Sequence, residues 1–146
     1  MKVSTRVEYG LIALMDIVIY GENGQSVSAL EIAQRENISH KYLEHILFLL
    51  RQAGFIAAQK GMKGGYSLAR PADEIVLSDV LNALDSTILS GLDDCGEDST
   101  LRSVIKVCFW EKINSNLNRY TEQLKLSEVV NQCRKNIPES WDMYVI

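Results

Sequence analysis

The chain has 146 residues, 47% of them hydrophobic and 23% charged, which is an ordinary composition for one globular domain. It contains no apolar run of about 18 residues, so no membrane-spanning helix and no membrane association are expected. The N-terminal stretch lacks the apolar core of a signal peptide, which predicts a cytoplasmic protein. Three cysteines are too few, and odd in number, for a secreted disulfide framework.

The net charge of −4 is divided unevenly along the chain. Residues 1–70 carry eight Lys/Arg and six Asp/Glu, a net charge of +2, whereas residues 71–146 carry seven and thirteen, a net charge of −6. Such a division suits one half that faces DNA and another that faces a partner or an effector. An asymmetry of this size also arises by chance, so charge alone does not decide between the two.

Two helices are predicted at the start of the chain from capping residues and apolar spacing. Residues 4–20 have Ser4 as N-cap and apolar side chains at helical intervals. Ser28 and Glu31 form a capping-box pattern at the start of a second, short helix. That helix ends at a tight turn over residues 36–38, so the two patterns predict the first part of a helix-turn-helix.

A third helix and an extended pair of strands follow. Ser39 is the predicted N-cap of the third helix, and Gly54 ends that helix as a C′ residue. Short strands are expected at 55–58 and 66–69, joined by a basic, glycine-rich loop at 60–65. This order of elements is typical of a winged helix-turn-helix, which places one helix in the DNA major groove and a hairpin beside it.

The second half of the chain is predicted to supply a dimerisation helix over residues 99–124. It follows a short helix, capped by Ser78 and ending at Leu84, and an irregular acidic stretch; a further short helix is expected over 127–134. The predicted dimer interface is an apolar series with coiled-coil spacing: Trp110, Ile113, Leu117, Tyr120 and Leu124. Packing of this series on its own domain is the alternative. We favour a homodimer because winged-helix regulators pair to match two-fold operators.

These elements predict a mainly α fold, a winged helix-turn-helix with a small two-stranded wing and a long C-terminal dimerisation helix. The expected organisation is a DNA-binding domain over 1–85, an acidic effector loop over 86–98, and a dimerisation helix with its tail over 99–146. The last part is expected to form one compact unit with the first.

The predicted DNA contacts lie on the third helix and on the wing. First-turn residues of a recognition helix point toward base edges, and basic, glycine-rich tips approach phosphates or the minor groove. The predicted contacts are Ser39, His40, Lys41, Tyr42, Glu44, His45, Lys60, Lys63, Gly64 and Gly65, with phosphate contacts from Lys2, Arg6 and Arg51. The alternatives are a solvated helix face and an ordinary flexible hairpin, and Tyr42 is expected to lie half in the core.

Four stretches resemble one family of regulators. They are MKVSTRVEYGL, ISHKYLEHILFLLRQAGFI, KGMKGGYSLAR and FWEKINSNLNRYTEQLKLSEVV. They resemble the Rrf family of IscR-, NsrR- and CymR-like bacterial transcription regulators, whose dimer helix matches the last stretch. The resemblance implies a homodimeric, helical protein with a small wing that binds palindromic promoter sites. It also implies a response to iron–sulfur status, nitric oxide, redox state or cysteine supply.

The cysteines depart from the pattern of the family's cluster-binding members, which carry three closely spaced cysteines before the dimer helix. Only Cys95 lies in that loop, and four acidic neighbours disfavour its thiolate; Cys108 and Cys133 are distant in the sequence. Glu8 matches a carboxylate position of some cluster-binding relatives, so Glu8 and Cys95 are the candidate iron–sulfur cluster ligands. We favour a protein with no cluster and no metal. The tail WDMYVI agrees, because it resembles the family's cysteine-metabolism branch.

Cys133 is the candidate redox thiol because Arg134 and Lys135 follow it, with a half-buried structural cysteine as the alternative. The predicted function is a homodimeric DNA-binding regulator, a repressor tied to redox, iron–sulfur or cysteine/sulfur metabolism. A regulatory enzyme or a small-molecule effector is its expected further partner. The alternatives are an iron–sulfur sensor with an unusual ligand set, and an interaction module that docks a metabolic enzyme. Catalytic motifs are absent, so no enzyme is expected.

Overall fold

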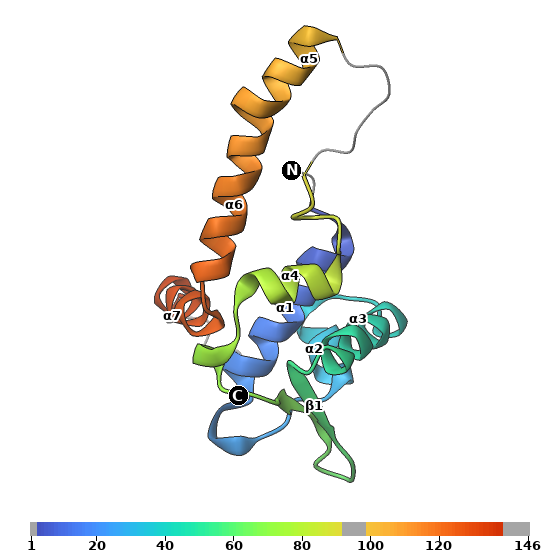
Figure 1. Ribbon diagram of the computed structural model, residues 1–146. Helices are drawn as coiled ribbons and strands as arrows, with labels where there is room; N and C mark the ends of the chain where they lie inside the picture. Colours follow the sequence, from blue (N-terminus) through green and yellow to red (C-terminus); the bar gives the residue numbers. More distant parts are fainter. Residues whose placement is uncertain (1–2, 92–98, 139–146) are drawn as a thin grey trace.

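The computed structural model of the chain describes residues 3–91 and 99–138. It is mainly helical with one two-stranded wing, as the sequence predicts (Figure 1). In chain order the elements are α1 (Thr5–Tyr20), η1 (Glu22–Gly24), α2 (Ala29–Glu36), α3 (His40–Gln52), β1 (Ile56–Gln59), β2 (Gly65–Leu68), η2 (Ala72–Glu74), α4 (Leu77–Leu84), α5 (Thr100–Ile105), the π-helical η3 (Lys106–Trp110), α6 (Glu111–Gln123) and α7 (Leu126–Asn136). No helix in these described ranges is both long enough and apolar enough to cross a membrane.

The predicted capping residues set the starts of the first three helices. Ser4 accepts a hydrogen bond from the backbone of α1, and Ser28 and Glu31 form both hydrogen bonds of a capping box at α2. Ser39 caps α3 in the same way, and each such cap stabilises its helix by about 1 kcal/mol. Gly54 follows α3 with φ of +84°, the left-handed conformation of a C′ residue. Local sequence therefore places the helix-turn-helix.

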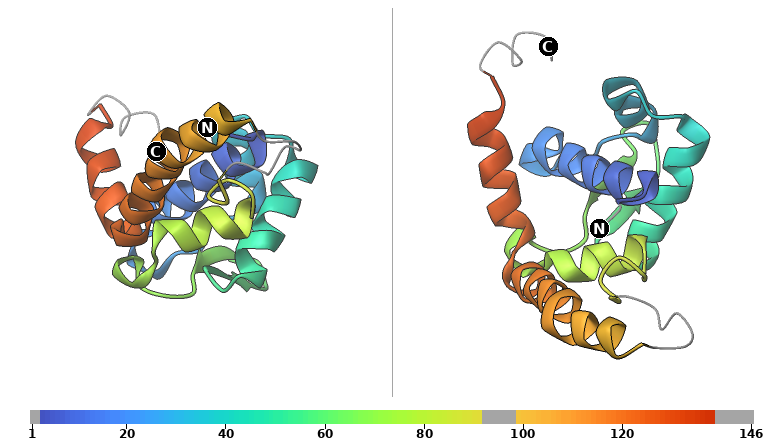
Figure 2. Two further views of the ribbon diagram at one scale, coloured as in Figure 1. Left: turned by 45° about the horizontal axis from the view of Figure 1, so that its top comes forward. Right: turned by 90° about the horizontal axis from the view of Figure 1, so that it is seen from above.

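The hydrophobic core surrounds α1, which lies between α7 on one side and α2 and α3 on the other (Figure 2). Apolar side chains of α1, α3 and α4 interdigitate there without solvent exposure, among them Leu14, Leu43, Leu47, Leu50 and Val80. Burial of each such side chain contributes about 1.5–3 kcal/mol. This core fixes the orientation of α3 relative to the rest of the body.

Helices α1 and α4 are joined at a close crossing. A Cβ added to Gly10 would lie 2.5 Å from the side chain of Leu84, so any larger residue here would force the buried Leu84 side chain to move. At the same crossing the Arg6 guanidinium donates a hydrogen bond to the backbone oxygen of Leu84. The Arg6 side chain therefore connects two helices, and its contact with phosphate stays a prediction.

The wing is an antiparallel pair in which Ile56 lies opposite Leu68 and Gln59 lies opposite Gly65. Both strands are displaced by one residue from the predicted ranges. The body extends this pair, because Val27 and Tyr66 exchange two backbone hydrogen bonds of 2.9 and 2.7 Å. The wing is consequently attached to the chain just before α2.

Helix α4 begins one residue before the predicted cap. Its N-cap is Val76, without a side-chain hydrogen bond, and Ser78 is buried inside the helix, so the prediction of a Ser78 cap is wrong. The reason is non-local: Val76 forms a β-bridge with Lys125, and the backbone of Leu77 donates to the oxygen of Leu124 over 2.9 Å. Pairing with the start of α7 therefore sets this helix end.

The long helix expected over 99–124 is present as the continuous run α5–η3–α6, which we call the projecting helix (residues 100–123). It rises away from the body, with α7 at its base (Figure 1). Its end differs from the prediction in one respect: Leu124 is extended and packs against the core, so Leu124 does not continue the apolar series on the helix. Of the predicted effector loop, residues 92–98 lie outside the described residues, and Leu89 in the remainder is buried.

Candidate nucleic-acid interface

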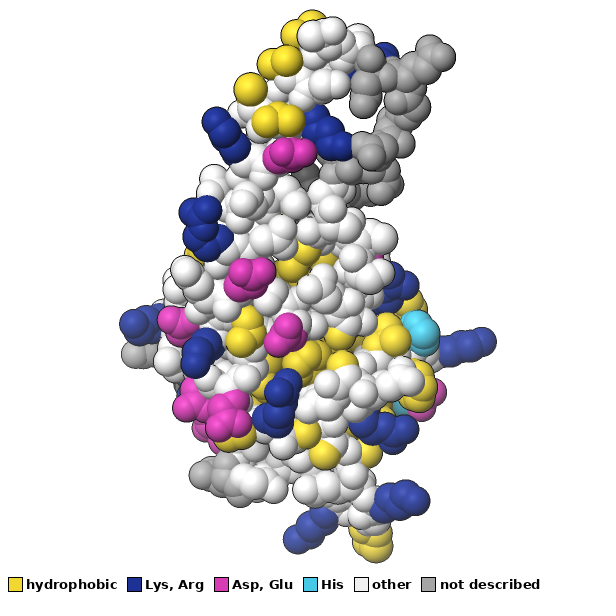
Figure 3. All heavy atoms as spheres, viewed as in Figure 1, with side chains coloured by type: hydrophobic (Ala, Val, Ile, Leu, Met, Phe, Trp, Pro, Cys, Tyr) yellow, Lys and Arg dark blue, Asp and Glu magenta, His cyan; other side chains and the backbone are white. Residues whose placement is uncertain are grey.

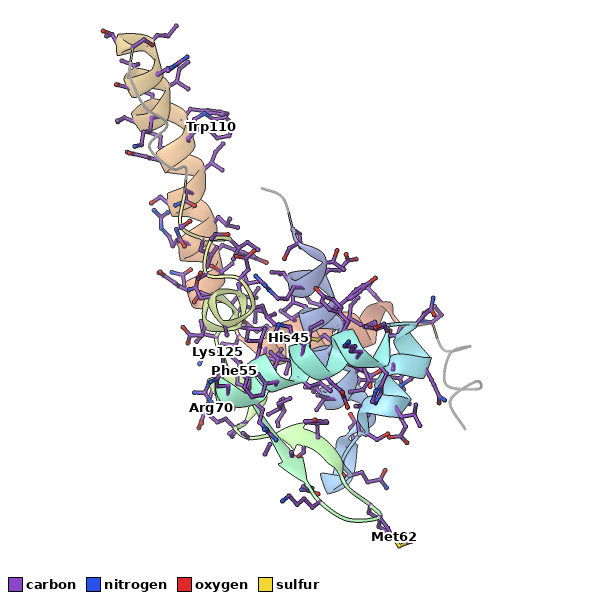
Figure 4. The ribbon with its side chains drawn as sticks, turned by 90° about the vertical axis from the view of Figure 1, so that its right-hand side faces the viewer. His45, Phe55, Met62, Arg70, Trp110 and Lys125 are labelled. Carbon is purple, nitrogen blue, oxygen red and sulfur yellow. The ribbon has the colours of Figure 1, made fainter. Side chains whose placement is uncertain are left out.

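Helix α3 divides into a buried face and an exposed face. Leu43, Ile46, Leu47 and Leu50 fill the core, whereas Lys41, Glu44 and His45 are exposed on the other side. Figure 4 shows His45 on α3 above the wing, so the helix and the hairpin lie on the same side of the molecule. This is the relation between recognition helix and wing that DNA-binding winged helices use.

The first turn of α3 is organised before any ligand binds. The Ser39 hydroxyl accepts from the backbone of Tyr42 over 3.2 Å, and the Nδ1 of His40 lies 3.8 Å from a carboxylate oxygen of Glu44. The Tyr42 ring packs edge-on against Tyr9 with 5.9 Å between centroids. Tyr42 is partly buried and supports the helix from its inner side, as the half-core prediction for it states.

Sequence reasoning missed Phe48, which is 48% exposed. It lies one helical turn after Glu44 and His45, so it continues the same exposed face of α3. The signal was its spacing of four and three residues from those two side chains. A phenyl ring at this position suits apolar contact with a thymine methyl group.

The wing carries exposed lysines on a backbone with tight internal contacts. Lys60 and Lys63 are exposed, and Figure 3 shows Lys and Arg side chains at the tip of the wing and beside a histidine on the α3 side. Gly64 and Gly65 have a role within the protein, and their predicted contact with DNA stays a prediction. A Cβ at Gly64 would lie 2.5 Å from the Gln59 oxygen, and one at Gly65 would lie 2.6 Å from the Val27 oxygen. Both glycines therefore permit close packing within the protein.

Of the two other predicted phosphate contacts, Arg51 and Lys2, the structure describes only Arg51. Arg51 is exposed in the last turn of α3, within the same face of the molecule. Lys2 lies outside the described residues. Arg70, which the sequence did not single out, is exposed and places its guanidinium 5.3 Å from the centre of the Phe55 ring at the base of the wing (Figure 4).

A charged network that the sequence did not reveal holds α2 against α1. Arg35 donates two hydrogen bonds of 2.9 Å to the buried carboxylate of Asp16 and lies over the ring of Tyr20 at 4.0 Å. Burial, and then the hydrogen bond and charge of Asp16, raise the pKa of the neighbouring Glu36 carboxyl to about 7. Glu36 ends α2 next to the turn of the helix-turn-helix, so this network sets where α2 lies.

A large apolar groove of about 820 Å³ lies beside this network, between α1, α4 and α7; we call it the α1–α7 groove. Its apolar wall includes Leu11, Ile12, Met15, Ile19, Leu81 and Val129, and its charged lining consists of Asp16 and Glu36. Cys133 also lines it and is half-buried. Arg134, which was expected to activate that thiol, forms an ion pair with Glu22.

The residues that could hold iron do not come together in the described structure. Cys108 is exposed on η3, Cys133 lines the α1–α7 groove, and Glu8 is exposed on α1. Within residues 3–91 and 99–138 no three His, Cys, Asp or Glu side chains are close enough together to bind a metal ion. Cys95 lies outside those ranges. The described residues therefore do not supply the ligand set of an iron–sulfur cluster.

The projecting helix exposes apolar side chains along most of its length. Of the predicted dimer interface, Trp110, Ile113 and Tyr120 are 44–61% exposed, whereas Leu117 is partly buried. A second set, not predicted, lies nearer its start and is 43–68% exposed: Leu101, Val104, Ile105, Val107 and Phe109. The exposed apolar surface is thus larger than the predicted series and extends farther from the body.

The fold, the exposed face of α3 and the basic wing define a winged-helix DNA-binding protein. Residues 3–132 match the family model Rrf2, described as an iron-dependent transcriptional regulator. The chain is 33% identical to the regulator IscR of Cereibacter sphaeroides over 135 residues, covering 89% of this chain and 87% of that protein. It is 40% identical to protein rrf2 of Nitratidesulfovibrio vulgaris over 113 residues, covering 77% and 73%.

Solved structures agree with this assignment. The CymR global cysteine regulator of B. subtilis superimposes with a TM-score of 0.77 at 24% identity, covering 90% of this chain and 98% of that one. T. potens IscR superimposes with a TM-score of 0.73 at 28% identity, covering 99% and 96%. The chain belongs to the Rrf2 family, and it is a DNA-binding transcriptional regulator of the winged-helix type and not an enzyme.

Proposed function

We propose that the protein acts as a homodimer on a palindromic promoter site and represses transcription there. The observation that carries this proposal is the separation of two surfaces: the exposed α3 face and the wing lie at one end, and the exposed apolar side chains lie on the projecting helix at the other. A two-fold pair joined through the second surface presents two copies of the first. Their recognition helices would then enter successive major grooves about 34 Å apart.

The dimer contact is proposed between the projecting helix of one copy and the α1–α7 groove of the other, together with helix-to-helix contact. Each copy offers one exposed apolar helix and one apolar groove of about 820 Å³, so reciprocal docking leaves neither surface in water. Exposed apolar surface of this extent is unusual on a protein that remains monomeric. An obligate dimer of this kind buries well over 2,000 Å² in total.

Within each half-site the two DNA-facing regions have different parts. Lys41, Glu44 and His45 point from α3 toward base edges and are proposed to discriminate among sequences. Lys60 and Lys63 on the wing are proposed to bind phosphates, which adds affinity for every sequence.

A direct test compares these two parts on the same DNA. Sites are selected from a random duplex pool, and binding is measured by fluorescence anisotropy over a range of salt concentrations. Lys63→Ala is expected to weaken binding to all duplexes and reduce the salt slope by about 1, whereas His45→Ala is expected to change preference at one base pair with little change in slope. If the two variant proteins show the same changes in affinity and in sequence preference on all the selected duplexes, the proposed division of roles between α3 and the wing is wrong. A dimer that binds none of the selected duplexes would favour the alternative of an interaction module that docks a metabolic enzyme.

For the effector we propose control by an enzyme partner or a metabolite, without an iron–sulfur cluster. The support is the ligand geometry: the described residues bring no three ligands together, and only one cysteine lies in the loop before the projecting helix. Protein purified without oxygen is expected to be colourless and free of iron and sulfide. Stoichiometric iron with visible absorbance would instead favour the cluster-sensing alternative, with Glu8 and Cys95 as the next residues to replace.

A further inference from the structure

The tip of the wing exposes a methionine between two lysines. Met62 is the most exposed of the large hydrophobic residues in the described chain, at 106% of the reference area. Figure 4 shows it at the far end of the hairpin, directed away from the body. Lys60 and Lys63 on either side are exposed as well. At this exposure the side chain buries no area within the described chain, so its whole length is available to contact a bound molecule.

The tip is supported rather than loose. The backbone of Gly64 donates to the oxygen of Gly61 over 2.9 Å, which closes the turn, and the Ser26 hydroxyl donates to the oxygen of Lys63 over 2.7 Å. Gly61 has φ of +112°, a conformation that side-chain-bearing residues rarely adopt. The protein therefore holds the backbone on both sides of Met62, and the side chain projects from a defined position.

The position of the tip relative to α3 indicates what Met62 meets. With α3 in the major groove, a hairpin on the same face reaches the neighbouring minor groove. There the two lysines meet phosphates on the groove walls, and the side chain between them is left facing the stacked base edges. Methionine is flexible and polarisable, and it is one of the apolar residues that insert between base steps and kink DNA.

We infer that Met62 is a minor-groove wedge that partly unstacks one base step beside each half-site and bends the DNA there. This inference rests on the proposed function, since it requires that α3 and the wing bind duplex DNA together. Pyrimidine–purine steps such as TA and CA unstack most easily, so the wedge adds sequence preference at a step that no hydrogen bond reads. The wing would then contribute both non-specific affinity, through its lysines, and shape-dependent specificity, through Met62.

The test uses the full-length protein and two substitutions at one exposed position. Met62→Gln keeps the length of the side chain and removes its apolar end, whereas Met62→Leu keeps an apolar wedge; Lys63→Ala is the control for phosphate binding. Bending is measured by fluorescence resonance energy transfer between the ends of a selected duplex. Affinity is compared for duplexes with TA or with GC at the step that the wing meets.

The wild type and Met62→Leu are expected to bend the TA duplex and to prefer it about tenfold over the GC duplex. Met62→Gln is expected to lose the bend and most of that preference while keeping the salt slope of the wild type. Lys63→Ala is expected to lower the salt slope and keep the TA preference. If the Met62→Gln protein bends DNA and prefers the TA duplex as the wild type does, the wedge proposal is wrong and the proposed function stands. A wild type that binds none of the selected duplexes would remove the proposed function, and the wedge with it.

Discussion

The body and the projecting helix contain similar apolar patterns with opposite outcomes. In α3 the apolar positions at helical spacing are fully buried, whereas Leu101, Val107 and Phe109 on the projecting helix are at least half exposed. Spacing thus shows that a helix has an apolar face, but it does not show whether that face is covered within the same chain or by another molecule. The difference separates a self-contained body from a helix whose apolar side chains remain exposed in the single chain.

The largest expected effect tests the self-contained body. Leu47→Ala removes a side chain of α3 that has no solvent exposure, and it is expected to lower the free energy of unfolding by about 2–5 kcal/mol. The control is Leu30→Ala on α2, the same deletion at a position that is 56% exposed, with an expected change within about 0.5 kcal/mol. Urea unfolding at one protomer concentration measures both. Equal losses in the two variants would contradict the burial on which the comparison depends.

The second prediction concerns the projecting helix and its proposed dimer contact. Phe109 is 52% exposed and packs edge-on against Trp110 with 4.9 Å between ring centroids. Phe109→Asp is expected to weaken the dimer by about 2 kcal/mol or more, roughly a thirtyfold rise in its dissociation constant, because a charge would enter an apolar contact. Sedimentation equilibrium measures the constant, and circular dichroism checks that the helix content is retained.

The control for this variant is Ser115→Asp, which adds the same charge at an exposed position on α6. It is expected to dimerise like the wild type, because the residues three and four positions away on the helix are all polar: Glu111, Lys112, Asn118 and Arg119. A Phe109→Asp protein with an unchanged dimer constant would place the dimer contact elsewhere. Loss of dimer in both variants would indicate a general effect of negative charge.

The sequence was most informative where structure depends on neighbouring residues. The caps at Ser4, Ser28 and Ser39, the left-handed Gly54 and the order of helices and strands were all predicted, because each depends on a few adjacent side chains. Strand ends were displaced by one residue, because pairing with Val27 is a contact across the fold. Local signals therefore define the elements better than they define the ends of those elements.

Features that depend on distant pairs were not predictable in this way. Arg6 has the sequence context of a free surface charge, yet its guanidinium bonds to Leu84, 78 residues away. Asp16 lies in an apolar helix pattern, and nothing local indicates that Arg35 would neutralise it. The exposed face of α3 could be predicted because it is what remains after the buried face is assigned, although Phe48 was overlooked. The interface residues themselves stay predictions until the DNA is bound.

The smallest expected effect concerns the α1–α7 groove, where the body is proposed to receive the projecting helix of a second copy. Glu36 lines the α1–α7 groove, and its pKa is raised to about 7, mainly by burial and then by Asp16. The folded protein therefore keeps this proton between pH 4.5 and about 7 while the unfolded chain releases it. Stability contributed by the protonated carboxyl is complete below pH 4.5 and is lost as the pH rises through about 7.

Glu36→Gln removes this titration without removing the side chain. The variant is expected to match the wild type near pH 4.5 and to be the more stable protein at pH 8, where the wild type must hold a charged Glu36 beside Asp16. Urea unfolding of both proteins at one protomer concentration across this range measures the divergence, since unfolding of a dimer depends on concentration. Docking of a second copy in the groove would exclude water from Glu36 and move the divergence to higher pH. Parallel stability curves from pH 4.5 to 8 would show that Glu36 is as well solvated in the folded protein as in the unfolded chain, and that the groove is more open than its lining indicates.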